Sequence, residues 1–500
     1  MSIDQIQDIE VLRQLVKMQQ RESEKLKKQL AEAYAELKGK NAAQAEQLAL
    51  DLAKLERQHA AALKQLFGQK SERRSKGKSK SSRGPQKGHG PKSQPSLPIK
   101  DEKHELPESE RICDLCQRVM EAWPDQFEES EEIDFIAPRV IIKRHLRQKY
   151  RCQCGGCIKT ARGPRKLFAK ARYSINLALH IATQKYCYHM PLARQAKVFK
   201  RQGLEVTTAT LWDYLSELYG LLIPAVERLD AHVLAQPVMG VDETPWKLLK
   251  VEQKGKSKTW WVWARRVKDA VSYTLSPSRG LETAKQILGD YRGKITVDGY
   301  GTYEALQRIN PHITLVHCWA HARRELLAFE EDPRAARMLR VIQRMYRLET
   351  MAEAKGLSPP ELVEWRKRKT RPLLDAYFRW LGTLEIPSTY ELHSAVRYML
   401  QREQSLMRFL DDALLGPDNN ATERIIRGIV VGRKTHYGSR SDLGTRVAAL
   451  FYSLLDSAEL AGVNPHEYLR IAIDAALDGE QIPLPHELAE RLSVPQVSVD

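Results

Sequence analysis

The sequence contains no apolar run of about 18 residues, so it offers no segment that would cross a membrane as a helix. Its first residues lack the basic region and apolar stretch that mark a secretory signal. Cysteine is scarce, with seven in 500 residues, and most of them fall in two short clusters. Dispersed disulfides are therefore not expected, and the pattern predicts a cytoplasmic protein whose cysteines hold a metal.

Acidic side chains are outnumbered, with 63 Asp and Glu against 80 Lys and Arg. The net charge of +17 indicates a polyanionic partner, because Lys and Arg that neutralise phosphates release condensed counterions. A charge excess that serves only solubility is the alternative. Hydrophobic residues make up 42%, as in folded proteins, and the length suits about three domains.

Residues 1–67 predict a coiled coil. Apolar residues recur at heptad spacing from Ile9 to Leu37 and, after a phase slip, from Leu48 to Leu66. We therefore expect self-association through this segment. A helix that folds back on its own chain is the alternative.

Residues 68–104 predict a basic disordered linker. The segment holds eleven Lys or Arg residues against three acidic ones, in a run rich in Ser, Gly and Pro. It has too little aliphatic content to fold alone. Lys76, Lys78 and Lys80 are expected to lie along DNA phosphates, unless the segment is a plain spacer.

Two cysteine clusters predict a structural zinc module over residues 105–170. The clusters consist of Cys113 and Cys116, then Cys152, Cys154 and Cys157. Such spacing suits a tetrahedral four-sulfur Zn²⁺ site. The second cluster offers three sulfurs for two places, so the ligand choice stays open, and incidental cysteines remain the alternative.

Residues 171–232 predict a helical region that contains a helix-turn-helix-like pair. One helix is expected from Pro191 to Gln202, Gly203 breaks it, and a Thr pair caps a second helix that runs to about Tyr219. The residues expected to contact DNA here are Arg194, Lys197 and Thr208. Any antiparallel helix pair has a similar pattern, so the DNA-reading role stays open.

From residue 233 the apolar pattern changes from helical to strand-like. Segments 233–330 and 413–460 are expected to form a mixed α/β catalytic core. A helical insertion over residues 331–412 interrupts that core, and a C-terminal module follows over residues 461–500.

Two apolar strands of this core run into Asp242 and Asp298. Adjacent carboxylates repel unless cations lie between them, and Mg²⁺ prefers oxygen ligands. A third carboxylate is needed, and Glu423 is the candidate, although it also fits a capping box with Asn420. The nearby cations expected to contact DNA are Arg424, Arg427, Arg433 and Lys434.

The chain as a whole resembles the transposases of the insertion-sequence sixty-six family, a DDE-type group with a ribonuclease H-like catalytic core. The cysteine clusters resemble its zinc module, although the family usually shows a simple second cysteine pair. The other matching motifs lie at residues 66–73, 189–195, 241–245, 297–300, 318–324, 419–424 and 462–469, in the family's order.

The resemblance implies a metal-binding catalytic triad of Asp242, Asp298 and Glu423, with Mg²⁺ or Mn²⁺ as the cofactor. It favours Asp242 over Glu243 as the first ligand. It also implies a Cys-x-x-His signature, formed here by Cys318 and His321, that lies close to DNA. We expect Cys318, His321 and the neighbouring Arg323 and Arg324 to contact DNA. A packed helix start, with His317 included, is the alternative there, and a zinc site is a further one.

The resemblance further implies a bacterial, nucleoid-associated enzyme that binds the ends of its mobile element. It would hydrolyse phosphodiesters there and transfer the freed 3′-hydroxyls to target DNA, with small accessory proteins. No covalent protein–DNA intermediate is expected, because the triad supplies metal ligands rather than a nucleophile.

Two other classes of protein fit parts of the sequence. A non-catalytic DNA-binding regulator would retain the zinc module and the helices, but the three acidic residues count against it. A coiled-coil scaffold whose linker only condenses nucleic acid would show no preference for element ends.

Overall fold

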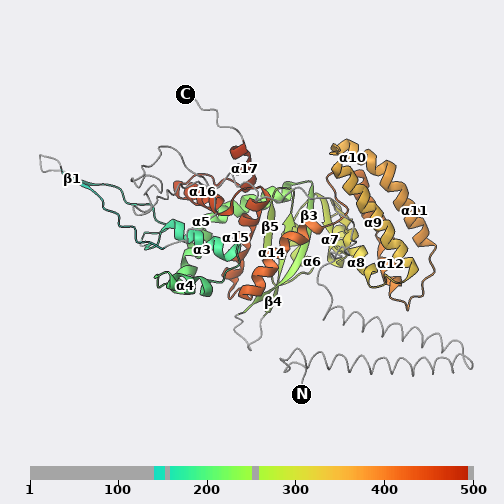
Figure 1. Ribbon diagram of the computed structural model, residues 1–500, viewed down its shortest axis with the longest axis horizontal. Helices are drawn as coiled ribbons and strands as arrows, with labels where there is room; N and C mark the ends of the chain where they lie inside the picture. The colour runs from blue at the N-terminus through green and yellow to red at the C-terminus, as the bar shows by residue number, and fades with distance from the viewer. Residues whose placement is uncertain (1–139, 152–157, 170, 250–257, 494–500) are drawn as a thin grey trace, which may run out of the picture. The chain divides into compact units, whose positions relative to one another are not determined.

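The computed structural model describes residues 140–151, 158–169, 171–249 and 258–493 (Figure 1). The predicted coiled coil, the basic linker and the five clustered cysteines lie outside these residues. Two short strands, β1 (Lys149–Arg151) and β2 (Ile158–Thr160), pair antiparallel on either side of the second cysteine cluster. Among the described helices, none combines the length and the apolar character needed to span a bilayer.

A five-stranded mixed sheet confirms the predicted α/β core. Its strands are β3 (Val238–Leu248), β4 (Lys258–Arg266), β5 (Val271–Ser276), β6 (Gly293–Val297) and β7 (Ile313–His317). They lie in the order β5-β4-β3-β6-β7, with β4 antiparallel to both β3 and β5. Strands β6 and β7 run parallel to β3. The sheet thus begins as a meander and continues by crossovers.

Both faces of the sheet are covered, as the sequence of β4 requires. Val262, Trp263 and Ala264 are consecutive and fully buried, so β4 has no solvent-facing side there. At the edge strand β5, Ser453 and Ser457 of α15 (Asp442–Leu460) accept hydrogen bonds from backbone amides. These buried hydroxyls satisfy donors that an edge strand would otherwise leave unpaired.

The predicted helix-turn-helix-like pair is present as α4 (Leu192–Arg201) and α5 (Thr208–Ala235), which pack with α3 (Ile175–Tyr186). Thr207 caps α5, because its side chain accepts from the amide of Thr210. The expected end near Tyr219 is wrong, since α5 continues through Pro224 to Ala235. Its buried residues recur at helical spacing over the whole length and pack into the core shared with the sheet.

The crossover between β6 and β7 contains a helix that the sequence reading missed, α7 (Gly301–Ile309). Its only strong signal is the pair of buried residues Tyr303 and Leu306, three positions apart. The segment between β5 and β6 carries α6 (Leu281–Leu288).

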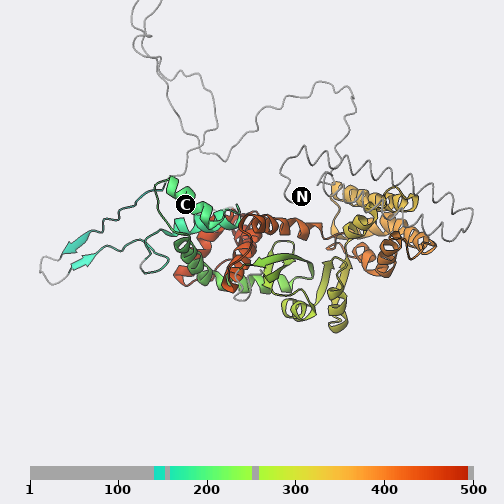
Figure 2. The ribbon, with the colours of Figure 1, turned by 90° about the horizontal axis from the view of Figure 1, so that it is seen from below.

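After β7 the chain enters a helical bundle with a second buried core, which also includes Val316 of β7. The bundle consists of α8 (Trp319–Leu327), α9 (Pro333–Ala354), α10 (Pro359–Trp365), η3 (Arg366–Thr370), α11 (Arg371–Gly382), α12 (Leu392–Gln401), α13 (Glu403–Met407) and η4 (Arg408–Asp411). Its helices gather in one group in both views (Figures 1 and 2). The chain then returns to the sheet through α14 (Asn420–His436) and α15, and ends in α16 (Pro465–Asp478) and α17 (Pro485–Ser493).

Candidate active site

Strand register places the two aspartates side by side. β3 and β6 are parallel, with Gly240 opposite Thr296. Continuing that register by two residues brings Asp242 opposite Asp298, which directly follows β6. Asp242 does not end its strand as expected, because β3 extends to Leu248, but it lies where the pairing with β6 ends.

The third carboxylate reaches this point because α14 packs directly on β3. A Cβ at Gly240 would lie 2.1 Å from the Thr422 hydroxyl oxygen, so only glycine permits this approach. The Asn419 side chain also donates to the carbonyl of Val241 at 2.9 Å. These contacts fix the first turn of α14, and with it Glu423, beside Asp242.

The carboxylates interact electrostatically. The pKa of Asp242 is raised to about 7, mainly by burial and in part by the negative charges of Asp298 and Glu423. An amide hydrogen bond from Glu243 to Asp242 opposes this rise. The three predicted triad members therefore interact electrostatically at the same edge of the sheet.

Glu423 is held by residues of α8 rather than by its own helix. The Arg324 guanidinium donates to its Oε2 atom, and His321 Nδ1 lies 3.6 Å from its Oε1 atom. The capping-box alternative is wrong, because the cap residue is Asn419, which makes no side-chain capping bond. Glu423 is one position beyond the place where a capping-box acid would stand.

The Cys-x-x-His signature lies at the start of α8. The Cys318 sulfur has no exposed surface and accepts the amide of Asn419 at 3.2 Å, so it joins the starts of α8 and α14. Cys318 thus packs inside the fold, and its contact with DNA stays a prediction. His317 is also buried and bonds Ser405 through Nδ1, as the packed-helix alternative expects.

Sequence reasoning missed the contact between Glu243 and Tyr303, which lies beside the triad. The Tyr303 hydroxyl donates to Glu243 Oε1, and burial raises the pKa of Glu243 to about 7. Glu243 is thus engaged by α7, which agrees with Asp242 as the first metal ligand.

The donor set fits a hard divalent cation. Asp242, Asp298 and Glu423 offer only oxygens, which suit Mg²⁺ or Mn²⁺. Glu423 Oε1 is buried and has no hydrogen-bond partner within the described part of the chain. Cys318, His321 and Glu423 have ligand atoms within 4.8 Å of one another, a criterion that the three triad carboxylates do not meet in this structure. The Cys318 sulfur already accepts a hydrogen bond from the Asn419 amide, and burial raises the Cys318 pKa to about 11.

Basic side chains line the exposed side of α14. Arg424, Arg427 and Lys434 are exposed and recur at helical spacing, and we call them the α14 basic stripe. Among the described residues, none of the three forms an ion pair. Arg433 differs, because its guanidinium donates to the Pro245 carbonyl of β3 and is partly buried.

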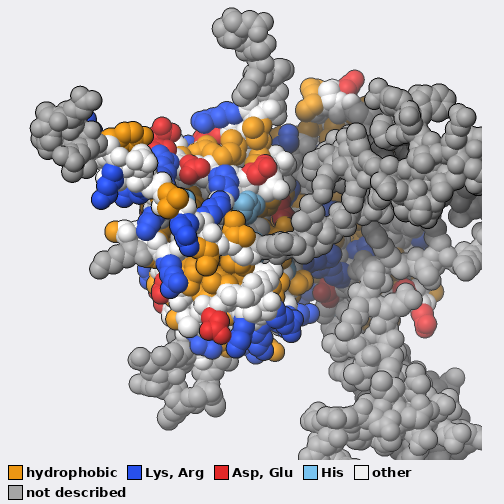
Figure 3. Space-filling model, turned by 60° about the vertical axis from the view of Figure 1, so that its left-hand side comes forward, with side chains coloured by type: hydrophobic (Ala, Val, Ile, Leu, Met, Phe, Trp, Pro, Cys, Tyr) orange, Lys and Arg blue, Asp and Glu red, His pale blue; other side chains and the backbone are white. Residues whose placement is uncertain are grey.

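The predicted DNA-contacting residues Arg194, Lys197 and Thr208 are exposed on the helix pair, about 200 residues before the stripe in sequence. The view that brings this side of the molecule forward shows Lys and Arg side chains among apolar ones (Figure 3). Arg323, on α8, is half-buried, unlike the exposed Arg324.

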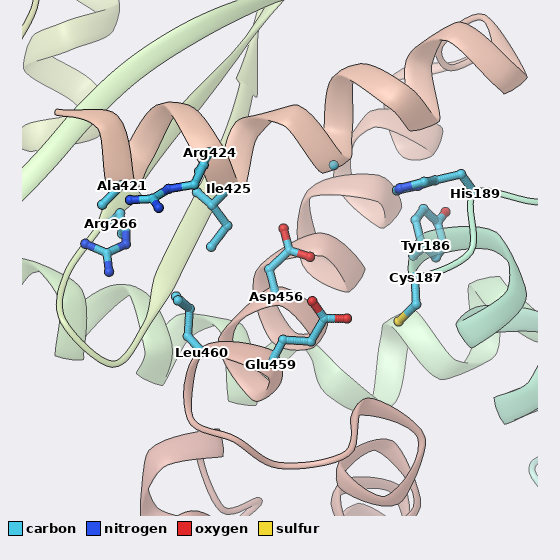
Figure 4. Close-up of a pocket in the computed structure, with 11 residues that line it drawn as sticks. Tyr186, Cys187, His189, Arg266, Ala421, Arg424, Ile425, Asp456, Glu459 and Leu460 are labelled. Atoms are coloured by element: carbon cyan, nitrogen blue, oxygen red, sulfur yellow. The ribbon is translucent and has the colours of Figure 1, made fainter. Parts of the chain in front are cut away.

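A cavity of about 550 Å³ lies between α14, α15 and the end of α3 (Figure 4). Arg266 and Arg424 lie together at one end, while Asp456 projects from α15 toward α14. None of the triad carboxylates lines this cavity. It is therefore distinct from the candidate active site, although Arg424 belongs both to it and to the stripe.

Comparison with known proteins shows that this protein belongs to the class of transposases. The family described as "Transposase IS66 family" matches residues 170–447, which is more than half of the chain. The chain belongs to the IS66 transposase family. Membership implies a function in DNA transposition, with DNA as a partner and a requirement for a divalent metal.

Three similar proteins come from Sinorhizobium fredii (strain NBRC 101917 / NGR234). Uncharacterized protein y4jD is 28% identical over 393 residues, covering 75% of this chain and 76% of that protein. Uncharacterized protein y4hP is 27% identical over 371 residues, and uncharacterized protein y4qI is 28% identical over 362 residues. Each of these two alignments covers 68% of this chain and 66% of the relative.

Proposed function

We propose that this protein is a DDE-type transposase that cleaves the ends of its element and transfers them to target DNA. The observation that carries the proposal is the convergence of Asp242, Asp298 and Glu423 from β3, β6 and α14. Three segments distant in sequence bring only oxygen donors to the same edge of the sheet, and family membership supplies the reaction class.

The sheet topology supports a ribonuclease H-like core. Three antiparallel strands are followed by two parallel ones, in the spatial order β5-β4-β3-β6-β7. The first aspartate stands on the central strand and the second follows its parallel neighbour. The third acid begins a helix after the insertion.

Asp242, Asp298 and Glu423 would hold Mg²⁺ or Mn²⁺. When bound, such ions activate a water or a 3′-hydroxyl and stabilise the leaving oxygen of a phosphodiester. The fixed backbone of β3 keeps Asp242 in place, and the tight packing at Gly240 does the same for Glu423. None of the three carboxylates is a nucleophile in this scheme, so no covalent protein–DNA intermediate forms.

The DNA would contact several basic surfaces. The α14 basic stripe begins one residue after Glu423, so phosphates that reach the metal site pass Arg424. We propose that the helix pair α4–α5 binds element ends and that the basic linker adds contacts that do not depend on sequence. We further propose that the protein self-associates through residues 1–67, that its clustered cysteines form a zinc module, and that accessory proteins take part in transposition.

Cleavage of a duplex that carries the element's terminal repeat, with Mg²⁺ present, tests the proposal. Glu423→Gln, Asp242→Asn and Asp298→Asn should each lower cleavage by about two orders of magnitude or more, while end binding persists. The losses should be strongly non-additive, because each change breaks the same assembled site.

The matched control is Glu325→Gln, which removes an exposed acid of α8. It should cleave at near the wild-type rate. A Glu423→Gln protein that also cleaves at near that rate would remove Glu423 from the triad. Binding of element ends without metal-dependent cleavage by the wild type would favour a DNA-binding regulator instead.

A further inference from the structure

The third carboxylate of the candidate active site, Glu423, forms an ion pair with Arg324 of the same chain. Arg324 donates through one terminal nitrogen to Glu423 Oε2 and through the other to His321 Nε2 at 3.1 Å. The Arg324 side chain is 39% exposed, whereas that of Glu423 is 16% exposed. The guanidinium thus approaches a sheltered carboxylate from the solvent side.

This arrangement neutralises Glu423 without a metal. The acid needs positive charge, because Asp242 and Asp298 lie beside it and like charges repel. Its other oxygen, Oε1, is buried without a hydrogen-bond partner among the described residues. Arg324 therefore supplies the charge compensation that a divalent ion would otherwise provide.

Two roles for Arg324 predict opposite effects on metal binding. A fixed support would stay bonded to Glu423 and hold it in the geometry that a metal needs, so its loss would weaken metal binding. A competitor would share the same carboxylate oxygen and repel the incoming dication, so its loss would strengthen metal binding. The direct bond to a ligand oxygen and the exposed path out of the site favour the competitor.

We propose that Arg324 holds Glu423 in the metal-free protein and is displaced when a divalent ion binds. Arg324 is then a positioning residue that sets the metal concentration at which the site fills. This inference rests on the proposed function, because it takes Glu423 to be a metal ligand.

Calorimetric titration of the full-length protein with Mn²⁺, without DNA, tests the inference. Arg324→Met should bind Mn²⁺ roughly fivefold more tightly than the wild type, the effect expected of one partly exposed ion pair. Arg323→Met removes the same charge from the next position of α8 and should change the affinity by less than about twofold. Arg324→Lys keeps the charge but cannot contact Glu423 and His321 through two separate nitrogens. Its Mn²⁺ affinity should therefore lie between those of the wild type and Arg324→Met.

Unchanged or weaker Mn²⁺ binding by Arg324→Met would overturn the inference and make Arg324 a support. If Arg324→Met does not fold, a wild-type affinity in Arg324→Lys would overturn it equally. Asp242→Asn identifies the site, because it should abolish the same binding event. Failure of the wild type and of Arg324→Met to bind Mn²⁺ would instead count against the proposed metal site itself.

Discussion

Burial raises the pKa of the carboxyl groups of Asp242, Glu243 and Asp456 to about 7. Asp456 is the clearest case outside the candidate active site, because burial raises its pKa to about 7. Its Oδ2 atom accepts a hydrogen bond from the Tyr273 hydroxyl at 2.8 Å, which opposes the rise in pKa, whereas the negative charge of Glu459 contributes to it. The folded protein therefore binds a proton at Asp456 more tightly than the unfolded chain does.

Asp456→Asn should stabilise the protein at neutral and higher pH. Because the folded-state pKa is raised, the wild type loses stability as the pH increases from about 4 to about 7. The Asn amide does not titrate and still accepts from Tyr273. The difference in free energy of unfolding between variant and wild type should grow by about 1–3 kcal/mol between pH 5 and pH 8.

Urea denaturation at the two pH values measures this difference. The control is Glu353→Gln, which removes an exposed carboxylate of α9 and should shift stability by less than about 0.5 kcal/mol at either pH. A difference that shrinks toward pH 8 would mean that Asp456 is charged and stabilised in the folded state.

At the scale of elements, the site depends on how closely α14 approaches β3. Gly240 and Thr422 are in such close contact that a single methyl group would separate the helix from the strand. Asn419, itself buried, adds the hydrogen bond to Val241. The helix is thus fixed at its first turn, one residue before Glu423.

Gly240→Ala should therefore damage both stability and metal binding. The added methyl group has no space, and overpacking of this kind costs about 1–3 kcal/mol in unfolding free energy. Displacement of α14 should also weaken Mn²⁺ binding, measured by calorimetry. Gly220→Ala is the control, because nothing lies within 4 Å of its new methyl group and alanine favours a helix such as α5. Equal behaviour of the two variants would contradict the close-packing account.

The strands of the core could be predicted from sequence because their apolar runs are local. Val238 to Val241 and the Trp-rich run of β4 needed no tertiary information. The mixed sheet itself is confirmed, whereas the roles of the triad residues were taken from the resemblance and stay predictions. The structure adds their arrangement: the parallel pairing of β3 with β6 aligns Asp242 with Asp298, and the packing of α14 on β3 brings Glu423 to the same sheet edge.

Other features of the site depend on contacts between distant residues. Arg324 and Glu423 are 99 positions apart, and no local pattern links them. The burial of Cys318 likewise depends on the return of α14 after the whole insertion. The length of α5 was underestimated because Gly220 and Pro224 are typical of helix ends, yet packing on the core continues the helix.

At the scale of the whole molecule, the predicted coiled coil bears on assembly. Deletion of residues 1–67 should lower the mass measured by light scattering, because heptad-spaced apolar residues would no longer associate. The far-ultraviolet circular dichroism of the remaining chain should still show a folded α/β core. An unchanged mass would place self-association elsewhere in the chain.

The net charge of +17 is distributed over surfaces that should contribute differently to DNA binding. The α14 basic stripe adjoins the candidate active site, whereas Arg368 and Lys369 lie exposed on η3 of the insertion. If DNA passes along α14, the stripe residues contact phosphates directly. The insertion residues then contribute only to the long-range electrostatic attraction between the protein and DNA.

Two charge-matched double variants separate these contributions. Arg427→Gln with Lys434→Gln should weaken binding to all DNA sequences alike and flatten the log–log dependence of affinity on salt by at most about two units. Arg368→Gln with Lys369→Gln should leave that slope nearly unchanged. Fluorescence anisotropy of labelled duplexes at several salt concentrations measures both. Equal slopes for the two variants would mean that DNA does not follow α14, and the basic linker with Lys76, Lys78 and Lys80 would then be the next surface to neutralise.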